Sequence, residues 1–259
     1  MPENGGRTIS HEPADCGTPV PGFPRFSVDA SMDEFEAWMD YLFNRPLGVW
    51  EPAWYYDLTE EELPREWTLR YEGTDSPEAE AERIRRLFSD AGTLLRPYAD
   101  EQVGNGLNVI VSGAMDASVA SLVNPDVPSA LRAEGLRSIV TLFAEVFAPR
   151  LAHPDWPPRT DGGKGSHPLD FICFMFWDIC PFVPGRDDVT LEVLEATLAL
   201  ESDACQRSAL HGLGHVDPPV LVKAAGIIDR WLRQHPDVPE QLRASLRSFG
   251  RGPIWPQTS

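Results

Sequence analysis

Apolar residues recur every three or four positions through most of this chain, and prolines or helix-capping residues separate the stretches in which they do so. A helix with 3.6 residues per turn gathers such positions on one face, so this spacing predicts amphipathic α-helices. The clearest stretch begins at Ser129 and is predicted to end before Pro149. Its apolar residues are Leu131, Leu136, Ile139, Val140, Phe143, Val146 and Phe147. The pattern favours an all-α fold.

Several other helices are expected from the same periodicity. Ser76 stands before a proline and a glutamate, as at a helix N-terminus, and Asp203 is predicted to cap another helix. In the stretch from 222 to 232 the predicted inward residues are Val222, Ala225, Ile228, Trp231 and Leu232. The remaining helices are expected at 33–43, 101–114, 169–180, 191–200 and 242–249.

The consecutive helices of the C-terminal half are short and are joined by brief capped turns. Each pair would expose an apolar face that only its neighbours can cover, so we predict HEAT-like stacked helical hairpins, an α-solenoid. Residues 1–30 are rich in glycine, proline and polar residues and are expected to form a flexible arm. Residues 31–259 are expected to form a single helical domain, with an irregular, aromatic and acidic portion at 47–67 and a long loop at 153–168.

Two segments carry a resemblance to a known group of proteins. The residues Ala204 to His215, ACQRSALHGLGH, look like a helix of uncharacterised bacterial HEAT-like proteins. The residues Cys173 to Asp178, CFMFWD, are similar to a segment of the same group. The resemblance covers roughly the last hundred residues and implies a stacked helical fold, but it brings no catalytic residues with it. HEAT-like proteins commonly serve as protein-binding scaffolds, which is an expectation by analogy.

The charge balance limits the partners. Forty acidic and 22 basic residues give a formal net charge of -18, which disfavours nucleic acid and anionic membrane surfaces as partners. An acidic surface suits a basic protein partner, although acidity also serves solubility alone. We expect no membrane span, because no apolar run approaches ~18–20 residues. The N-terminal residues do not resemble a secretory signal, and four scattered cysteines suit a reducing compartment, so a cytoplasmic location is expected.

The best candidate for chemistry is the pair His211 and His215. Residues four apart lie on one face of a helix, so the two imidazoles could share a metal ion such as zinc. Asp203, Asp217 or the thiol of Cys205 are the candidates for a further ligand. The spacing lacks the glutamate of the H-E-x-x-H metalloprotease motif. The alternative is a structural role, in which the histidines hydrogen-bond a neighbouring helix end.

Asp178 interrupts an otherwise apolar helix, where an unpaired carboxylate is costly to bury. We expect it to pair with an arginine such as Arg186 or Arg207, and the alternative is a functional carboxylate. Cys205 is expected to be a small buried hydrophobe, because neither a lowered pKa nor an orienting partner is visible. Gly212 indicates that another element packs closely against this backbone.

These observations lead to two hypotheses of different kinds. The first is a non-enzymatic protein-binding scaffold without a cofactor, of the immunity or antitoxin type, that faces a basic toxin with its acidic surface. The second is a metal-dependent hydrolase, with a divalent metal such as zinc at His211 and His215. The absence of a clear catalytic motif favours the scaffold.

Overall fold

The computed structural model describes residues 33–44, 76–112, 118–152, 167–181 and 188–238, together with 240, 243, 244 and 246. The regular secondary structure of these residues is helical and includes no strand, which confirms the predicted all-α class. The expected N-terminal arm, the aromatic portion at 47–67, and most of the loop at 153–168 and of the last helix lie outside the described residues.

The helices lie close to the predicted positions. They are α1 (Glu34–Phe43), α2 (Pro77–Ser89), α3 (Ala91–Leu94), α4 (Asp100–Ser112), α5 (Ser129–Leu142), α6 (Ala148–Arg150), α7 (Asp170–Ile179), α8 (Asp188–Leu198), α9 (Asp203–Gly214) and α10 (Leu221–Gln234). Short 3-10 turns occupy Val119–Val123 and Pro218–Val220, and a π-helical turn occupies Phe143–Phe147. None of these helices is both long and apolar enough to cross a membrane.

The helix starts follow from local side chains. The Ser76 hydroxyl accepts a hydrogen bond from the backbone N–H of Ala79 at 3.1 Å, as predicted for the start of α2. The prediction for α9 is one residue late, because Ser202 and not Asp203 is the cap. Ser202 has the extended backbone that a cap requires, whereas Asp203 is already the first helical residue.

Pro149 does not end the helix that precedes it, contrary to the prediction. After α5 the chain makes the π-helical turn and continues through Pro149 as α6. A proline within a continuous helix has no N–H to donate to the preceding turn, and the π-helical turn lies directly before it. The backbone N–H of Leu151 then donates to the Phe147 carbonyl at 2.9 Å, so the helical path is kept.

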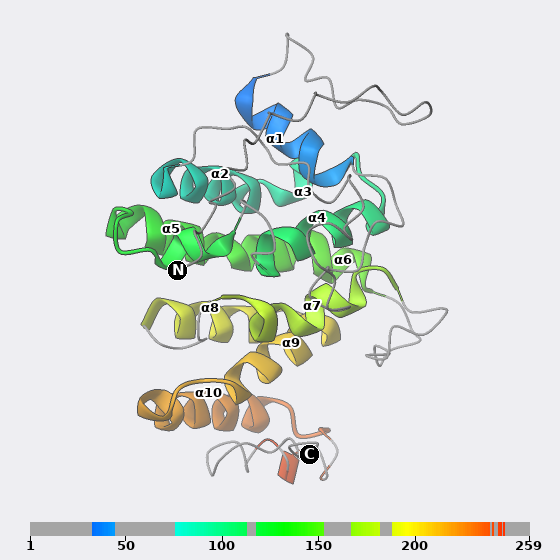
Figure 1. Cartoon of the computed structure of the whole chain (residues 1–259). Helices are drawn as coiled ribbons and strands as arrows, with labels where there is room; N and C mark the ends of the chain where they lie inside the picture. Colours follow the sequence, from blue (N-terminus) through cyan, green and yellow to red (C-terminus); the bar gives the residue numbers. More distant parts are fainter. Residues whose placement is uncertain are drawn as a thin grey trace, which may run out of the picture.

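The longer helices alternate between two columns along the chain (Figure 1). One column consists of α2, α5, α8 and α10, and the other of α1, α4, α7 and α9; each helix contacts the next helix of its own column. Successive segments of the chain therefore add to the two columns in turn. The short helix α3 follows α2 directly, and α6 follows α5 through the π-helical turn.

Two ion pairs fix the direction of α10 relative to α8. Lys223 Nζ lies 2.5 Å from Asp188 Oδ1, and Arg230 Nη2 lies 2.6 Å from Glu195 Oε1. The partners are 35 residues apart in both pairs. Because the offset is constant and later residues face later residues, the two helices run in the same direction.

The other column has the same parallel arrangement between α7 and α9. The ring of Phe174 lies against the ring of His211, with centroids 4.5 Å apart. Further along both helices, Asp178 lies 3.6 Å from His215. The two helices therefore also run side by side in one direction and end at the same side of the molecule.

The buried side chains of both columns form one continuous apolar core. Its largest fully buried members are Trp38, Phe43, Phe88, Phe143, Phe147, Phe176 and Trp177. In α10 the inward side chains are Ala224, Ile227, Ile228, Trp231 and Leu232. Val222, which was predicted to face inward, is 85% exposed, because the buried stripe of α10 starts at Ala224.

A clasp around Asp100, at the start of α4, binds Arg150 and His167, which precede and follow residues 153–166 in the sequence. Arg150 Nη1 lies 2.9 Å from Asp100 Oδ1, and His167 Nε2 lies 3.2 Å from Asp100 Oδ2. The Arg150 guanidinium also donates to the carbonyls of Leu95 and Tyr98. One carboxylate therefore holds the residues before and after the segment.

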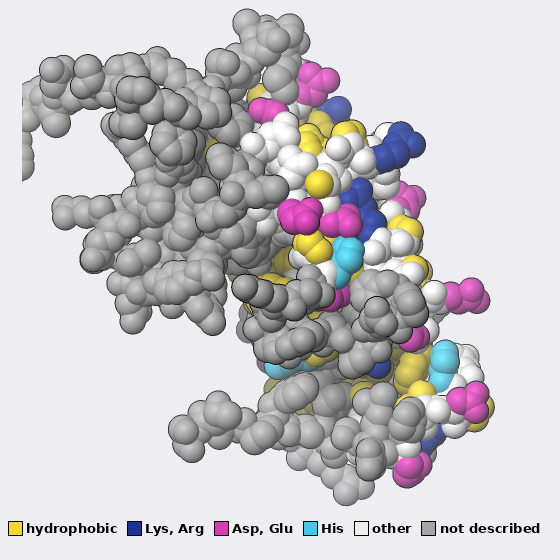
Figure 2. Space-filling model, turned by 90° about the vertical axis from the view of Figure 1, so that its right-hand side faces the viewer, with side chains coloured by type: hydrophobic (Ala, Val, Ile, Leu, Met, Phe, Trp, Pro, Cys, Tyr) yellow, Lys and Arg dark blue, Asp and Glu magenta, His cyan; other side chains and the backbone are white. Residues whose placement is uncertain are grey.

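Figure 2 shows one face of the molecule, at right angles to the view of Figure 1. Over the described residues, acidic and basic side chains lie interspersed with apolar ones on this face. Phe171 and Val222 are the large hydrophobic side chains that remain exposed among the described residues. The acidic excess of the sequence is therefore not gathered into one patch on the described part of this face.

Candidate functional site

Gly212 brings α9 close to α7 and α8. A Cβ atom at this position would lie 2.7 Å from Trp177 Cγ and 2.8 Å from Leu194 Cδ2, distances that real side chains do not tolerate. The expectation that something packs tightly on this backbone is confirmed. Because the backbones approach so closely, short side chains in the last turns of α7 and α9 can reach one another.

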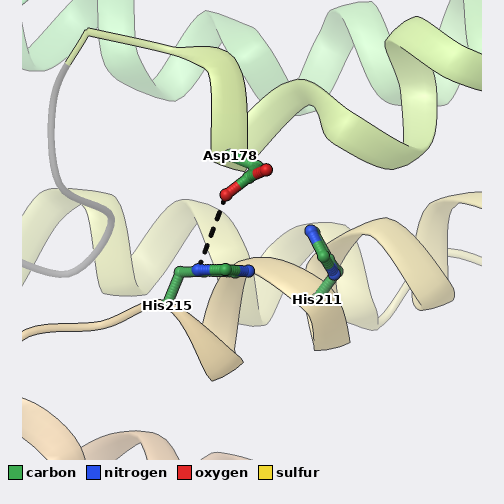
Figure 3. Close-up of side chains that lie close together, drawn as sticks. All are labelled: Asp178, His211 and His215. Atoms are coloured by element: carbon green, nitrogen blue, oxygen red, sulfur yellow. Dashed lines mark ion pairs between the residues drawn. The ribbon is translucent and has the colours of Figure 1, made fainter. Parts of the chain in front are cut away.

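Asp178, His211 and His215 meet at these last turns (Figure 3). Asp178 comes from α7, and both histidines come from α9. One ligand atom from each of the three residues lies within 4.8 Å of the other two. Asp178 Oδ1 is 3.6 Å from His215 Nδ1, and the two imidazole centroids are 4.6 Å apart in an edge-on arrangement.

His211 is the inner member of this cluster. The residue is half-buried, and both of its ring nitrogens are buried. Burial lowers the pKa of His211 to about 4, with a further decrease from His215 and an opposing increase from Asp178. The imidazole is therefore neutral at pH 7, and its lone pair needs no proton release before it can bind a cation.

The outer members are more open to solvent. The side chains of Asp178 and His215 are 36% and 32% exposed. His215 Nε2, in contrast, is buried and has no hydrogen-bond partner among the described residues. The cluster therefore has a packed inner side at His211 and an accessible outer side formed by the other two residues.

The third member of the cluster differs from the sequence-based candidates. Among the described residues, Asp178 joins the histidines, and Asp203, Cys205 and Asp217 do not. Asp203 lies in the first turn of α9, at the opposite end from His215. The thiol of Cys205 is buried and donates to the Phe143 carbonyl at 3.6 Å.

Asp178 was expected to pair with an arginine, and its ion pair among the described residues is with His215. Arg186, one of the two arginines considered, lies outside the described residues. Asp178 and His215 both stand near the ends of predicted helices, but nothing in the sequence shows that these two helices lie side by side and parallel, so the pairing was missed.

The cysteines near this region are buried. Cys173 of α7 and Cys205 of α9 are completely buried and carry thiols, not a disulfide. Burial, with Cys205 alongside, raises the pKa of the Cys173 thiol well above its ordinary value. This thiol therefore stays protonated at neutral pH. Its hydrogen bond to Cys205 lowers the pKa of the Cys205 thiol, so the expectation that Cys205 has neither a lowered pKa nor an orienting partner is wrong.

Two imidazole nitrogens and one carboxylate oxygen make a donor set that suits zinc and related transition metals. Three protein ligands leave one position of a tetrahedral ion for water or another molecule. Comparisons of the chain with protein-family models, curated proteins and solved structures found no match.

Proposed function

We propose that this protein is a HEAT-like helical-repeat scaffold that binds another protein. The observation that carries the proposal is the alternation of the longer helices between two columns, in which α8 and α10, and likewise α7 and α9, run parallel to each other. Parallel neighbours within each of two columns are expected when successive helical hairpins stack on one another.

The proposed contact region is a groove of about 390 Å³ between α8 and α10. Leu191 and Ile227 contribute apolar side chains to it, and Glu192 lies on its α8 side. Val222 also lines the groove and is 85% exposed, more than any other large hydrophobic side chain among the described residues. An apolar side chain beside a groove gains most by burial against a partner, so Val222 is the proposed anchor.

The proposed partner is a basic protein. The net charge of -18 attracts cationic proteins over a distance and speeds their docking. Within the groove, Glu192 binds Arg137 of α5 at 3.0 Å with both side chains more than half exposed. An arginine of the partner can replace Arg137 as the ion-pair partner of Glu192 at little cost in free energy, because exposed ion pairs are weak. Immunity or antitoxin-like proteins that neutralise a basic toxin have this chemistry, and we propose this class.

The test is capture from cells that produce the protein, followed by titration of the identified partner. We expect a basic partner whose binding weakens as the salt concentration rises, because exposed charges are screened. Val222→Asp is expected to weaken binding at least tenfold. Phe171→Asp is the matched control, because Phe171 is the other exposed large hydrophobic residue but lies on α7.

Three results would contradict the proposal. The first is that no protein is captured, and the second is that the partner is acidic and its binding does not depend on salt. The third is an equal loss of binding in both variants, since Val222 would then contribute no more to binding than Phe171 and the groove would not be the contact region.

A further inference from the structure

We propose that Asp178, His211 and His215 form a binding site for a divalent transition metal ion of the zinc type, at the point where α7 and α9 both end. The site does not depend on the proposed protein partner. The helix ends and the donor atoms of the cluster support it.

The helix ends favour a cation at this point. Asp178 lies in the last turn of α7, His211 in the last turn of α9, and His215 is the C-cap of α9. The unsatisfied carbonyls at a helix C-terminus carry a partial negative charge of roughly half an electron. Because the two helices are parallel, two such ends lie together beside the Asp178 carboxylate. A divalent cation is stabilised by all three.

The distances require a small adjustment. Ligand atoms around a tetrahedral zinc ion are about 3.3 Å apart, given metal–ligand distances of roughly 2.0–2.2 Å. The three donor atoms lie within 4.8 Å of one another, so they must draw together by at most about 1.5 Å. Asp178 and His215 can make this movement by side-chain rotation, because about a third of each side chain is exposed.

The donor types select the class of metal. Calcium and magnesium prefer six or more oxygen ligands, and this cluster offers one carboxylate and two imidazoles. Imidazole suits zinc, copper, nickel and cobalt. Both ring nitrogens of His211 and Nε2 of His215 are buried, whereas about a third of the Asp178 and His215 side chains is exposed, so solvent meets the cluster at these two residues.

The same rings also make packing contacts, and the experiment must separate the two roles. The ring of His211 lies between Phe174 and His215, with centroid distances of 4.5 and 4.6 Å. A packing role requires the histidine rings but not the charge of Asp178. Asp178→Asn keeps nearly the same shape and removes the negative charge, so it weakens metal binding without disturbing the ring contacts.

The experiment is a calorimetric titration of the full chain, stripped with a chelator, against zinc and against magnesium. The variants are Asp178→Asn and His215→Gln, and the matched control is His235→Gln. His235 is also the C-cap histidine of a helix, but it stacks on Trp231 and is not in the cluster. Circular dichroism checks that each variant is folded, and cobalt substitution reports the ligand environment by visible absorption.

We expect one zinc ion per chain in the wild type and in His235→Gln, with magnesium binding at least a hundredfold weaker. Asp178→Asn and His215→Gln are expected to bind zinc at least tenfold less tightly and to change the cobalt spectrum. The inference is overturned if the stripped wild type takes up no zinc. It is also overturned if both cluster variants bind zinc as tightly as the wild type.

Discussion

The indole of Trp177 lies against the backbone of Gly212, so closely that a Cβ atom there would come within 2.7 Å of Trp177 Cγ. This contact joins the last turn of α7 to the last turn of α9. It also places Asp178, which follows Trp177, and His215, three residues after Gly212, within reach of each other. The packing of the core and the geometry of the cluster therefore depend on the same missing side chain.

Gly212→Ala is expected to destabilise the fold by about 1–3 kcal/mol, because the new methyl group meets Trp177 and Leu194 in a filled core. Gly226→Ala is the control, since its nearest contact would be the Arg230 side chain at 3.7 Å. There alanine replaces glycine within a helix and is expected to stabilise by up to about 1 kcal/mol. Urea denaturation measures both, and equal effects would show that Gly212 does not set the approach of the helices.

His211 should make the metal-free protein less stable in acid. Its pKa is lowered to about 4 in the folded protein and is ordinarily near 6.5. Between these values the unfolded chain binds more protons, so the free energy of unfolding decreases as the pH falls through this window. The slope contributed by one group is at most about 1.4 kcal/mol per pH unit.

His211→Gln is therefore expected to reduce this dependence on pH, while His235→Gln retains it. Denaturation in the presence of a chelator at several values between pH 7 and pH 4.5 gives the slope. An unchanged slope in His211→Gln would mean that this imidazole is not held neutral by its surroundings.

Arg150 is expected to matter more for stability than other charged residues. It binds Asp100 and also donates to the carbonyls of Leu95 and Tyr98. Arg150→Ala leaves these acceptors unsatisfied and is expected to cost about 2–3 kcal/mol. Arg230→Ala breaks an ion pair whose two side chains are about half exposed, so it is expected to cost less than ~1 kcal/mol. Thermal or urea denaturation would refute this ranking if the costs were equal.

The thiols of Cys173 and Cys205 are expected to resist alkylation in the folded protein, because both residues are completely buried. Mass spectrometry of peptides after treatment with iodoacetamide locates any label. Both cysteines should be modified in urea and remain unmodified in buffer on the same time scale. Rapid labelling of either residue in buffer would indicate that α7 and α9 separate readily.

The sequence predicted helix positions well because periodicity and caps are local properties. Ser76 and the apolar spacing of α2 act within a few residues of the chain, and tertiary packing did not alter them. The failures arose where distant contacts decide the outcome. The π-helical turn lets the helix continue past Pro149. The residues that α10 buries depend on how this helix is rotated against α8 and α9, and in the rotation observed Val222 is exposed.

The candidate site was predictable only in part for the same reason. His211 and His215 are four positions apart in one helix, so their proximity follows from helix geometry alone. Asp178 joins them through the parallel packing of α7 on α9, which no local pattern encodes. The sequence instead offered Asp203, Asp217 and Cys205, which are near in the chain but do not join the cluster; Asp203 and Cys205 lie towards the other end of α9.

The clasp at Asp100 has a practical consequence for engineering. Arg150 and His167 are bound by the same carboxylate, so a guest peptide inserted between these two residues would join the described helices at two points that are fixed to each other. Lengthening a flexible connection costs only about 0.6 kcal/mol for each doubling of its length. This position is therefore a suitable place for an epitope tag or a fluorescent reporter, with both columns of helices left as they are.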